Sequence, residues 1–323
     1  MGLILLDISF LIIGFILLIK GAQFLINGAS ALAQRYAIPD LLVGVTVLAF
    51  GTSMPELVVN AVSSYRGFHN MVFATIIGAN IFNLYVILGL VGLIIPFNLP
   101  NRTIWQEIPL LMVISILVFV LCNDALFFDK EVNEISRMDG VLLLSLFILY
   151  LLFIFAHLKG TGLNRVEKEI KIIPTWKILL WIGGGSLATS LGGDLIVDKA
   201  TSISNFFEVT RRFFGLTIIA TFTSLPELVT STIAVYRKQP GLAFGNVIAS
   251  SMFNFLFVLG VSGIVHDLPY NKGFNFDLNF FFFGTVLLFV GMFSGRLKRL
   301  DRWQSFFFLL FFIAYIYFVF VRV

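Results

Sequence analysis

The chain has 323 residues, of which 59% are hydrophobic and only 12% are charged, and its formal net charge is +4. A soluble globular domain carries about 25% charged residues, so this composition excludes an ordinary soluble domain and is typical of a protein that crosses a membrane many times. The single cysteine, Cys122, excludes an intrachain disulfide and a cysteine-based metal site.

A transmembrane helix needs about 20 mostly apolar residues. The sequence contains ten such stretches, which predicts an all-α polytopic membrane protein with ten transmembrane helices. In chain order we expect the spans at 3–34, 40–65, 71–95, 104–121, 139–156, 176–204, 212–236, 242–265, 275–294 and 303–321. The chain enters its first apolar run at once, without a basic region or a cleavage site, so we predict a first span and no removable signal peptide.

The basic residues predict an orientation, because Lys and Arg favour the cytoplasmic side of a membrane. They gather at 159–177 and again at 296–302. Both segments are cytoplasmic if both termini are extracytoplasmic, and Trp105, Trp176 and Trp303 then line up at the same interface. We therefore predict a multi-pass protein of the cell membrane, with both termini outside the cytoplasm.

The two halves of the chain are related by an internal repeat with an offset of 171 residues. Between Gly14 and Gly92, 21 of 79 positions are identical to their counterparts, without a gap. The matching pairs include Ser53 and Ser224, Pro55 and Pro226, Glu56 and Glu227, and Asn83 and Asn254. If each half holds five spans, an odd number, the second half enters the membrane in the opposite orientation. This is the inverted-repeat plan of secondary transporters, whose sites lie near the midplane where the repeats meet.

The repeat also predicts the domain organisation. We expect a first five-helix repeat at 1–156, a cytoplasmic linker at 157–175 and a second, inverted five-helix repeat at 176–323. The glycine-rich stretch WIGGGSLATSLGG at 181–193 has no phosphate-loop lysine, so we interpret it as a site of close helix packing. No catalytic triad, zinc motif or nucleotide fingerprint is present in the sequence, so we expect no enzyme activity and no cofactor.

One motif places a proline and a carboxylate where lipid is expected. In LAFGTSMPEL, at 48–57, Thr52, Ser53 and Glu56 share one helix face with Ala49. Pro55 removes a backbone hydrogen bond, and free carbonyls inside a membrane are tolerated only where protein, water or an ion satisfies them. The second half repeats this pattern in IATFTSLPEL, at 219–228, with Ala220, Thr223, Ser224, Pro226 and Glu227.

The next span of each half adds further oxygen ligands. IIGANIFN, at 76–83, supplies Asn80 and Asn83, and VIASSMFN, at 247–254, supplies Ser250, Ser251 and Asn254. Hard cations such as Ca²⁺ take about 6–8 oxygen ligands of these kinds. A Glu in the middle of a span costs at least about 2.5–3.5 kcal/mol to insert, so two at equivalent positions indicate an ion site rather than a simple helix kink.

Other polar residues are interpreted as structural. The three histidines, His69, His157 and His266, lie near predicted span ends and form no cluster in the sequence. We expect Asp194 and Asp198 to pair with Lys199 or Arg211.

GTSMPEL with GANIFN, and FTSLPEL with ASSMFN, resemble the two alpha repeats of prokaryotic members of the sodium/calcium exchanger family, within the calcium/cation antiporter superfamily. The resemblance covers nearly the whole chain and places the alpha repeats at 49–83 and 220–254. For Ca²⁺, it implies binding by Glu56, Glu227, Thr52 and Thr223. For Na⁺, it implies binding by Ala49, Ser53, Glu56, Ala220, Thr223, Ser224, Glu227 and Ser250. It also implies that Asn83 and Asn254 lie in the middle of the site.

The sequence departs from the family pattern at three positions that bear on the site. Phe222 stands where the family has a glycine before the threonine, Asn254 stands where relatives often have an aspartate, and Ala79 stands where the first repeat usually has a serine. The resemblance implies a secondary active antiporter that exchanges Na⁺ for Ca²⁺ by alternating access. Its expected partners are Ca²⁺, Na⁺ (or H⁺) and the lipid bilayer; no nucleic acid is expected and no obligate protein partner is evident. An H⁺-coupled cation antiporter is the alternative, because neighbouring carboxylates also bind protons. A cation channel is a further, weaker one.

Overall fold

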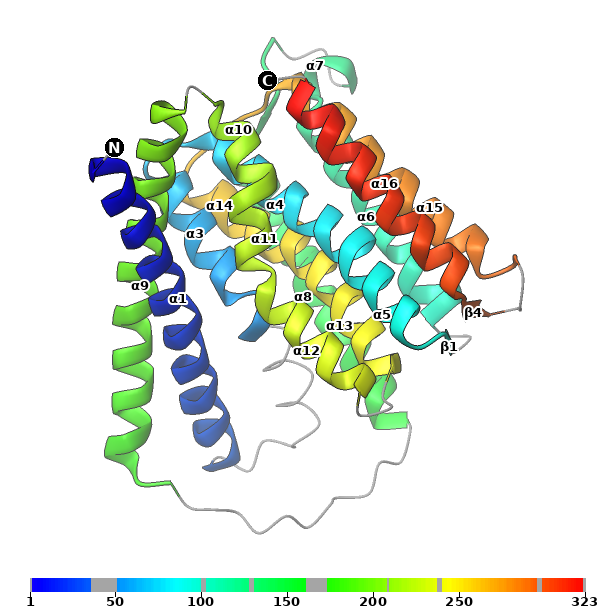
Figure 1. The fold of residues 1–323 in the computed structure, drawn as a ribbon. Coiled ribbons are helices and arrows are strands. Elements are labelled where there is room, and N and C mark those ends of the chain that lie inside the picture. The colour runs from blue at the N-terminus through cyan, green and yellow to red at the C-terminus, as the bar shows by residue number, and fades with distance from the viewer. Residues whose placement is uncertain are drawn as a thin grey trace.

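The computed structural model describes residues 2–35, 51–99, 103–127, 131–160, 173–207, 209–236, 240–294 and 298–321. These residues form a bundle of helices with two very short two-stranded sheets at its ends (Figure 1). In the first half, the elements are α1 (Gly2–Arg35), α3 (Met54–Tyr65), α4 (His69–Ile81), η1 (Phe82–Ile87), α5 (Leu88–Ile94), β1 (Phe97–Asn98), η2 (Thr103–Glu107), α6 (Ile108–Cys122), α7 (Asp124–Phe127), β2 (Glu134–Ile135) and α8 (Arg137–Gly160).

The second half continues the bundle with a similar series of elements. They are α9 (Thr175–Phe206), α10 (Arg211–Phe214), η3 (Gly215–Ile219), α11 (Ala220–Thr223), α12 (Leu225–Tyr236), α13 (Pro240–Phe253), η4 (Asn254–Val258), α14 (Leu259–Val265), β3 (Leu268–Pro269), η5 (Lys272–Phe274), α15 (Asn275–Gly291), β4 (Arg299–Leu300) and α16 (Arg302–Val321). Four of the η segments, η1 to η4, are π-helical turns.

The helices agree with the prediction of a polytopic helical membrane protein. Among the described residues, seven helices are long and apolar enough to cross a membrane, and a pair of helices bent by 43° raises this number to eight. The predicted span 71–95 is one continuous helical rod, His69–Ile94, and the predicted span 242–265 is the rod Pro240–Val265. The predicted span 40–65 lies partly outside the described residues. The predicted span 176–204 is helical as α9, although it is not among the seven.

The two halves share their element bounds as well as their sequence. Adding 171 to the bounds of three elements in the first half gives the bounds of three elements in the second. These pairs are α3 and α12, α5 and α14, and β1 and β3. The duplication seen in the sequence therefore extends to the local structure.

Two short sheets join the halves at their ends. Strand β1 pairs antiparallel with β4, with Phe97 opposite Leu300. Strand β2 pairs antiparallel with β3, with Ile135 opposite Leu268. Each sheet thus takes one strand from the first half and one from the second.

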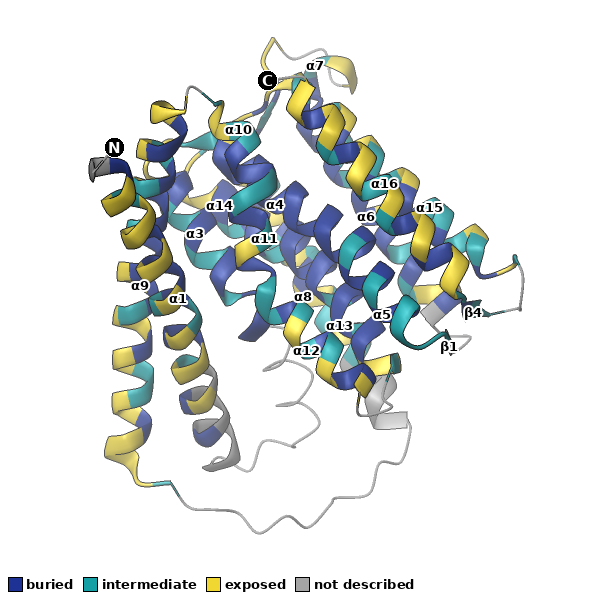
Figure 2. Ribbon diagram, in the orientation of Figure 1, coloured by how far each residue is buried: buried dark blue, intermediate teal, exposed yellow. Residues whose placement is uncertain are grey.

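The central helices are much more buried than the peripheral helices (Figure 2). In the rods His69–Ile94 and Pro240–Val265, 83% and 78% of the apolar stretch is buried inside the protein, whereas in Arg137–Ile154 only 17% is. The outer helices present exposed apolar side chains, as is expected where a helix faces lipid. The two central rods carry the amides and hydroxyls of the predicted site.

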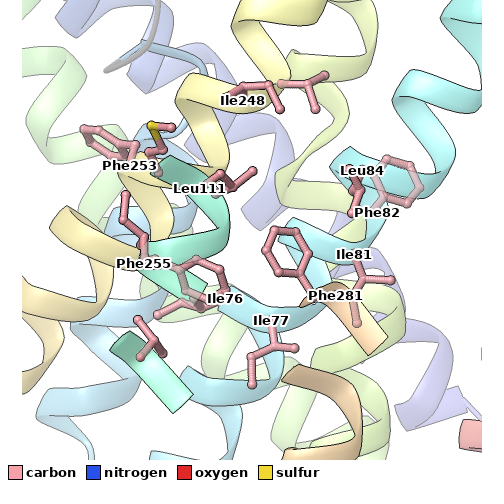
Figure 3. Packing of buried hydrophobic residues seen from close by; sticks show 14 of the residues in the cluster. Ile76, Ile77, Ile81, Phe82, Leu84, Leu111, Ile248, Phe253, Phe255 and Phe281 are labelled. Atoms are coloured by element: carbon pink, nitrogen blue, oxygen red, sulfur yellow. The ribbon is translucent and has the colours of Figure 1, made fainter. Parts of the chain in front are cut away.

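Large apolar side chains fix the two central rods against each other and against α6 and α15 (Figure 3). The close-up shows Ile81 and Phe82 of the first rod near Phe281 of α15, and Phe253 and Phe255 of the second rod near Leu111 of α6. Side chains that interdigitate in this way leave little freedom to the backbone. The polar groups on these rods are therefore held in place by apolar packing.

Helices α1 and α9 pack closely along one side of the bundle (Figure 1). A Cβ atom added at Gly21 of α1 would lie 2.9 Å from the Gly185 carbonyl oxygen, and one added at Gly192 of α9 would lie 2.7 Å from the Gly14 carbonyl oxygen. The glycine run at 181–193 therefore does serve close packing through Gly185 and Gly192, as predicted. Gly184, within the same run, has no atom within 4 Å of its added Cβ.

We expect Gly21→Val to destabilise the protein by about 1–3 kcal/mol, because the new side chain overpacks the contact with α9. Thermal unfolding in detergent, followed by gel filtration, measures the effect. Gly184→Val is the matched control, since it adds the same side chain where space is open. Equal melting temperatures for the two variants would contradict this account of the helix contact.

Candidate functional site

The two TSxPE motifs break their helices in the same way. Ser53, directly before α3, has φ −91° and ψ 7°, and Ser224, directly before α12, has φ −85° and ψ 6°. The prolines, Pro55 and Pro226, follow within the first turn of each new helix, where a missing N–H costs nothing. In the second half, the helical segments before and after the break, Arg211–Thr223 and Leu225–Tyr236, are bent by 43° relative to each other.

Each break brings a carboxylate into the centre of the bundle, next to the other half. Glu56 and Glu227 are both fully buried. The Ser224 Oγ donates a hydrogen bond to Glu56 Oε1 at 2.9 Å, and the Ser53 Oγ donates one to Glu227 Oε1, also at 2.9 Å. The serine of each half thus binds the glutamate of the other half, which ties together residues more than 160 positions apart in the chain.

The second oxygen of each glutamate has no hydrogen-bond partner in the described protein, and neither have several polar atoms from the same motifs. These atoms are Glu56 Oε2, Glu227 Oε2, Thr52 Oγ1, Asn80 Nδ2, both polar atoms of the Asn83 amide, Ser250 Oγ, Ser251 Oγ and Asn254 Oδ1. Buried polar groups are almost always satisfied, so a set of this size needs a partner from outside the described residues. Most of its members are oxygens, which fits a hard cation.

The amides of the site lie where the central rods change their winding. Asn83 lies in the π-helical turn η1, and Asn254 begins the π-helical turn η4. The Asn254 Nδ2 donates a hydrogen bond to Asn80 Oδ1 at 3.1 Å, which links the two rods directly. Single π-turns inside α-helices are frequent at functional sites, and here they occur at equivalent positions of the repeat.

Two of the predicted site residues, Ala49 and Ala220, differ from the others. Ala49 lies outside the described residues. The Ala220 carbonyl already accepts hydrogen bonds from the Ser224 N–H and the Thr223 Oγ1, each at 3.2 Å. The remaining predicted residues lie on the two breaks or on the two central rods, and all of them are buried except Pro226, which is half-buried.

The departure at Phe222 creates an aromatic contact. Its ring stacks on Phe15 of α1 with centroids 4.8 Å apart and an interplanar angle of 23°. Under the repeat offset, Gly51 and Ser186 occupy the corresponding positions and carry no ring. The two sides of the site therefore differ in what connects the motif helix to its long neighbour.

Two interpretations from the sequence need correction. The rings of His69 and His266 lie 5.0 Å apart, so two of the three histidines do come together, because the loop after α14 meets the start of α4. Asp198 pairs with Lys199 at 3.2 Å, as expected, but Asp194 pairs with Arg66 at 2.6 Å. Neither contact could be read from neighbours in the sequence.

The sequence reasoning also missed polar residues near the site and beyond it. Asn60 and Ser63 continue the helix face of Glu56 at i+4 and i+7, and this spacing was the available signal. Asp277 is fully buried and accepts hydrogen bonds from Arg212 at 2.6 Å and from the Tyr315 hydroxyl at 3.0 Å. This second group ties α10 to α15 and α16, and its charge is already paired.

The model of the sodium/calcium exchanger protein family matches residues 6–156 and 177–321, which is nearly the whole chain. The chain belongs to this family. It is therefore a multi-pass membrane protein of a transporter family.

Individual relatives agree with this assignment. The chain is 33% identical to the inner membrane protein YrbG of Escherichia coli over 270 residues, which cover 81% of this chain and 80% of the relative. It is 30% identical to the putative antiporter CaxA of Alkalimonas amylolytica over 319 residues, covering 96% and 98% of the two chains. Its fold is similar to that of the sodium-calcium exchanger NCX_Mj soaked with Na⁺ and Sr²⁺, with a TM-score of 0.64, 28% identity and coverage of 96% and 98%.

We expect Ser53→Ala and Ser224→Ala each to weaken cation binding about tenfold, because a hydrogen bond to a charged group contributes about 1.5 kcal/mol and also orients the glutamate. Calorimetric titration with Ca²⁺ in detergent measures the change. Ser64→Ala is the matched control, since this buried hydroxyl donates to the Ser262 carbonyl at 2.7 Å, not to either glutamate. An equal loss in all three variants would show that the two glutamate contacts have no special role.

Proposed function

We propose that the chain is a secondary active antiporter that exchanges Na⁺ for Ca²⁺ across the cell membrane by alternating access. The observation that carries this proposal is the pair of buried glutamates, each bonded by the serine of the other half and accompanied by oxygens that have no partner in the described part of the chain. Two ionised carboxylates balance the charge of one Ca²⁺. Family membership supports the same activity.

In this proposal, Ca²⁺ is held by Glu56 and Glu227, with oxygens of Thr52 and Thr223. The flanking Na⁺ ions use oxygens of Ala49, Ser53, Glu56, Ala220, Thr223, Ser224, Glu227 and Ser250. Asn83 and Asn254 lie between the two halves of the site. Since the glutamates serve both cations, Na⁺ entering from one side displaces Ca²⁺, and the two cannot be bound together at full strength.

The proposed architecture has ten transmembrane helices in two inverted five-helix repeats, 1–156 and 176–323, joined by a cytoplasmic linker at 157–175. The recurring element bounds support a duplication of whole helix sets. The two sheets, each with one strand from either half, support a twofold relation between the halves. An inverted pair of half-sites suits alternating access because each half can open toward one side of the membrane. Both termini are then extracytoplasmic.

We expect Glu56→Gln and Glu227→Gln each to reduce Ca²⁺ exchange to background, because a divalent ion then keeps one negative ligand where it had two. Ca²⁺ flux into sealed vesicles is measured with an opposing Na⁺ gradient, with an opposing H⁺ gradient and with neither. Glu131→Gln, at an exposed position, is the control for loss of a carboxylate.

These arms distinguish the proposed function from its rivals. Flux driven by the Na⁺ gradient supports Na⁺ coupling. Flux driven by H⁺ alone would replace it with H⁺ coupling, and flux that only follows the Ca²⁺ gradient would indicate a channel. Retained exchange in either glutamine variant would remove these residues from the site.

The two repeats differ in one hydroxyl at the proposed Na⁺ sites. Ala79 and Ser250 are equivalent and both fully buried, but only Ser250 has a hydroxyl, and that hydroxyl has no partner in the described protein. We expect Ser250→Ala to raise the Na⁺ concentration for half-maximal exchange about fivefold, which corresponds to about 1 kcal/mol for one lost ligand. Ala79→Ser should lower it, with little change in Ca²⁺ affinity. If neither variant changes the Na⁺ dependence, these positions do not bind Na⁺.

A further inference from the structure

A cavity of about 320 Å³ lies beside α10, outside the polar centre of the bundle. Three segments of the chain supply its polar lining, which consists of Asn70, Thr210, Arg211, Arg212 and Asn271. All of these side chains except Arg212 are exposed, so the cavity opens at the surface of the protein. None of them belongs to the motifs that carry the buried glutamates.

The cavity lies at the level where membrane-crossing segments begin or end. Four of its lining residues lie at or next to an end of such a segment. They are Asn70 in His69–Ile94, Arg211 in Arg211–Thr223, Asn271 before Lys272–Gly291 and Val319 in Arg302–Val321. Figure 1 shows α10 and the C-terminal end of α16 at the same end of the bundle. The end of an apolar span marks the boundary between hydrocarbon and headgroups, so the cavity lies at the level of the lipid headgroups.

The described residues of the cavity leave one positive charge unbalanced. Arg212 donates to the buried carboxylate of Asp277 at 2.6 Å and to the Gly273 carbonyl at 2.7 Å, so its charge is compensated inside the protein. The Arg211 guanidinium lies over the Phe68 ring, 4.6 Å from its centre. Among the described residues, no carboxylate forms an ion pair with Arg211. This arginine can therefore bind an anion.

The neutral groups of the cavity add hydrogen-bond donors. The Asn271 Oδ1 accepts from the Gly273 N–H at 2.8 Å, which leaves the Nδ2 group of this amide as a donor. The Thr210 Oγ1 accepts from the Phe213 N–H at 3.2 Å, and its own hydroxyl proton can still be donated. An arginine held over an aromatic ring presents a planar fork of donors that matches phosphate oxygens. The lining thus suits a phosphate, whereas a cation would meet an arginine.

The rest of the lining is apolar and comes from Phe213 and Val319. The half-buried Phe213 ring lies 6.1 Å from the ring of Phe320 on α16, and Phe320 is exposed. An apolar surface therefore borders the phosphate-binding groups at the edge of the bundle. A phospholipid needs both kinds of surface, because its phosphate is joined to acyl chains. A soluble phosphate would need only the donors.

The first half of the chain does not repeat the basic pair. Under the repeat offset, Arg211 and Arg212 correspond to Asp40 and Leu41, so the shared fold does not require arginines there. Lys and Arg favour the cytoplasmic side of a membrane. In the proposed orientation this pair lies on the opposite side, so a role in setting the topology does not account for it.

We propose that the cavity binds the phosphate of an anionic phospholipid. Arg211, Thr210 and Asn271 bind the headgroup, and an acyl chain lies along Phe213. In the proposed orientation the lipid belongs to the outer leaflet. Binding of this lipid goes beyond the proposed exchange of Na⁺ for Ca²⁺ and does not depend on it.

A comparison of two lipids on the unsubstituted protein tests the kind of occupant. Phosphatidylglycerol and phosphatidylcholine both contain a phosphodiester, but only phosphatidylglycerol has a net negative charge. Native mass spectrometry of the delipidated protein counts the lipids retained at each lipid concentration. We expect phosphatidylglycerol to bind about fivefold more tightly, as is typical for one basic residue facing an anionic lipid. Equal affinities for the two lipids would overturn the proposal.

Two arginine variants test the position of the site. We expect Arg211→Gln to weaken phosphatidylglycerol binding about tenfold, because hydrogen bonds to a charged group are lost. Arg302→Gln is the matched control, since Arg302 is also exposed and also begins a membrane-crossing segment but does not line the cavity. An equal loss in both variants would show general attraction of lipid to interfacial arginines and would overturn the site.

Thermal unfolding in detergent separates the lipid from a soluble anion. Phosphatidylglycerol should raise the melting temperature of the unsubstituted protein and of Arg302→Gln more than that of Arg211→Gln, because a ligand of the folded state stabilises it. Inorganic phosphate at the same concentration should have little effect. An equal rise with phosphate would make a soluble anion the occupant and overturn the lipid assignment.

These measurements do not require every variant to fold. If gel filtration shows that Arg211→Gln is misfolded, the comparison of the two lipids and of inorganic phosphate on the unsubstituted protein still decides the proposal. None of the measurements involves transport. A negative result therefore leaves the proposed exchange of Na⁺ for Ca²⁺ standing, and failure of the exchange leaves the lipid site standing.

Discussion

The burial of two carboxylates in the centre of a membrane protein is the constraint on which the other features depend. An unpaired buried charge costs several kcal/mol, so the surrounding chain has to supply compensation. Both helices that follow the breaks begin just before the glutamates, so Glu56 and Glu227 lie in the first turn, where the helix dipole favours negative charge. The reciprocal serine hydroxyls satisfy one oxygen of each glutamate. The other oxygens remain available for a positive ion.

The apolar packing fixes the positions of the polar groups in this centre. Of the seven membrane-length helices in the described residues, the central rods are the most buried, and their large side chains interdigitate around the π-helical turns at Asn83 and Asn254. Polar groups on a rigid backbone cannot collapse onto one another to satisfy themselves, which explains why so many of them lack partners among the residues that the structure describes. The long pair α1 and α9 combines close glycine contacts with a buried apolar cluster, to which α1 contributes Leu11 and Phe15 and α9 contributes Ile196.

Much of this arrangement could be predicted from the sequence, because apolar length identifies spans and the repeat offset identifies equivalent positions. The bounds of the rods and the importance of the TSxPE motifs followed from these two signals. The exchange of partners between Ser53 and Glu227, and between Ser224 and Glu56, did not, since a repeat shows which residues are equivalent but not which ones touch. The contact of His69 with His266 was missed for a similar reason, as it depends on how two loops meet in space. A hydroxyl without a partner among the described residues, such as that of Ser63, can be recognised only once the neighbouring carbonyls have been placed.

The reciprocal contacts between the halves have the form of an isologous dimer interface. Three kinds of contact occur twice, once from each half. Ser53 donates to Glu227 as Ser224 donates to Glu56, β1 pairs with β4 as β3 pairs with β2, and Gly21 lies against α9 as Gly192 lies against α1. Two separate copies of one half-length chain would have to keep both sides of such an interface identical, because a single gene would encode both. Fusion into one chain removes that restriction. Several equivalent positions now differ between the halves, and a symmetric dimer could acquire each such change only on both sides at once. The pairs are Gly51 and Phe222, Ala79 and Ser250, Asn60 and Ser231, and Ser63 and Ala234. The covalent link thus allows the two sides of the central polar cluster to evolve separately.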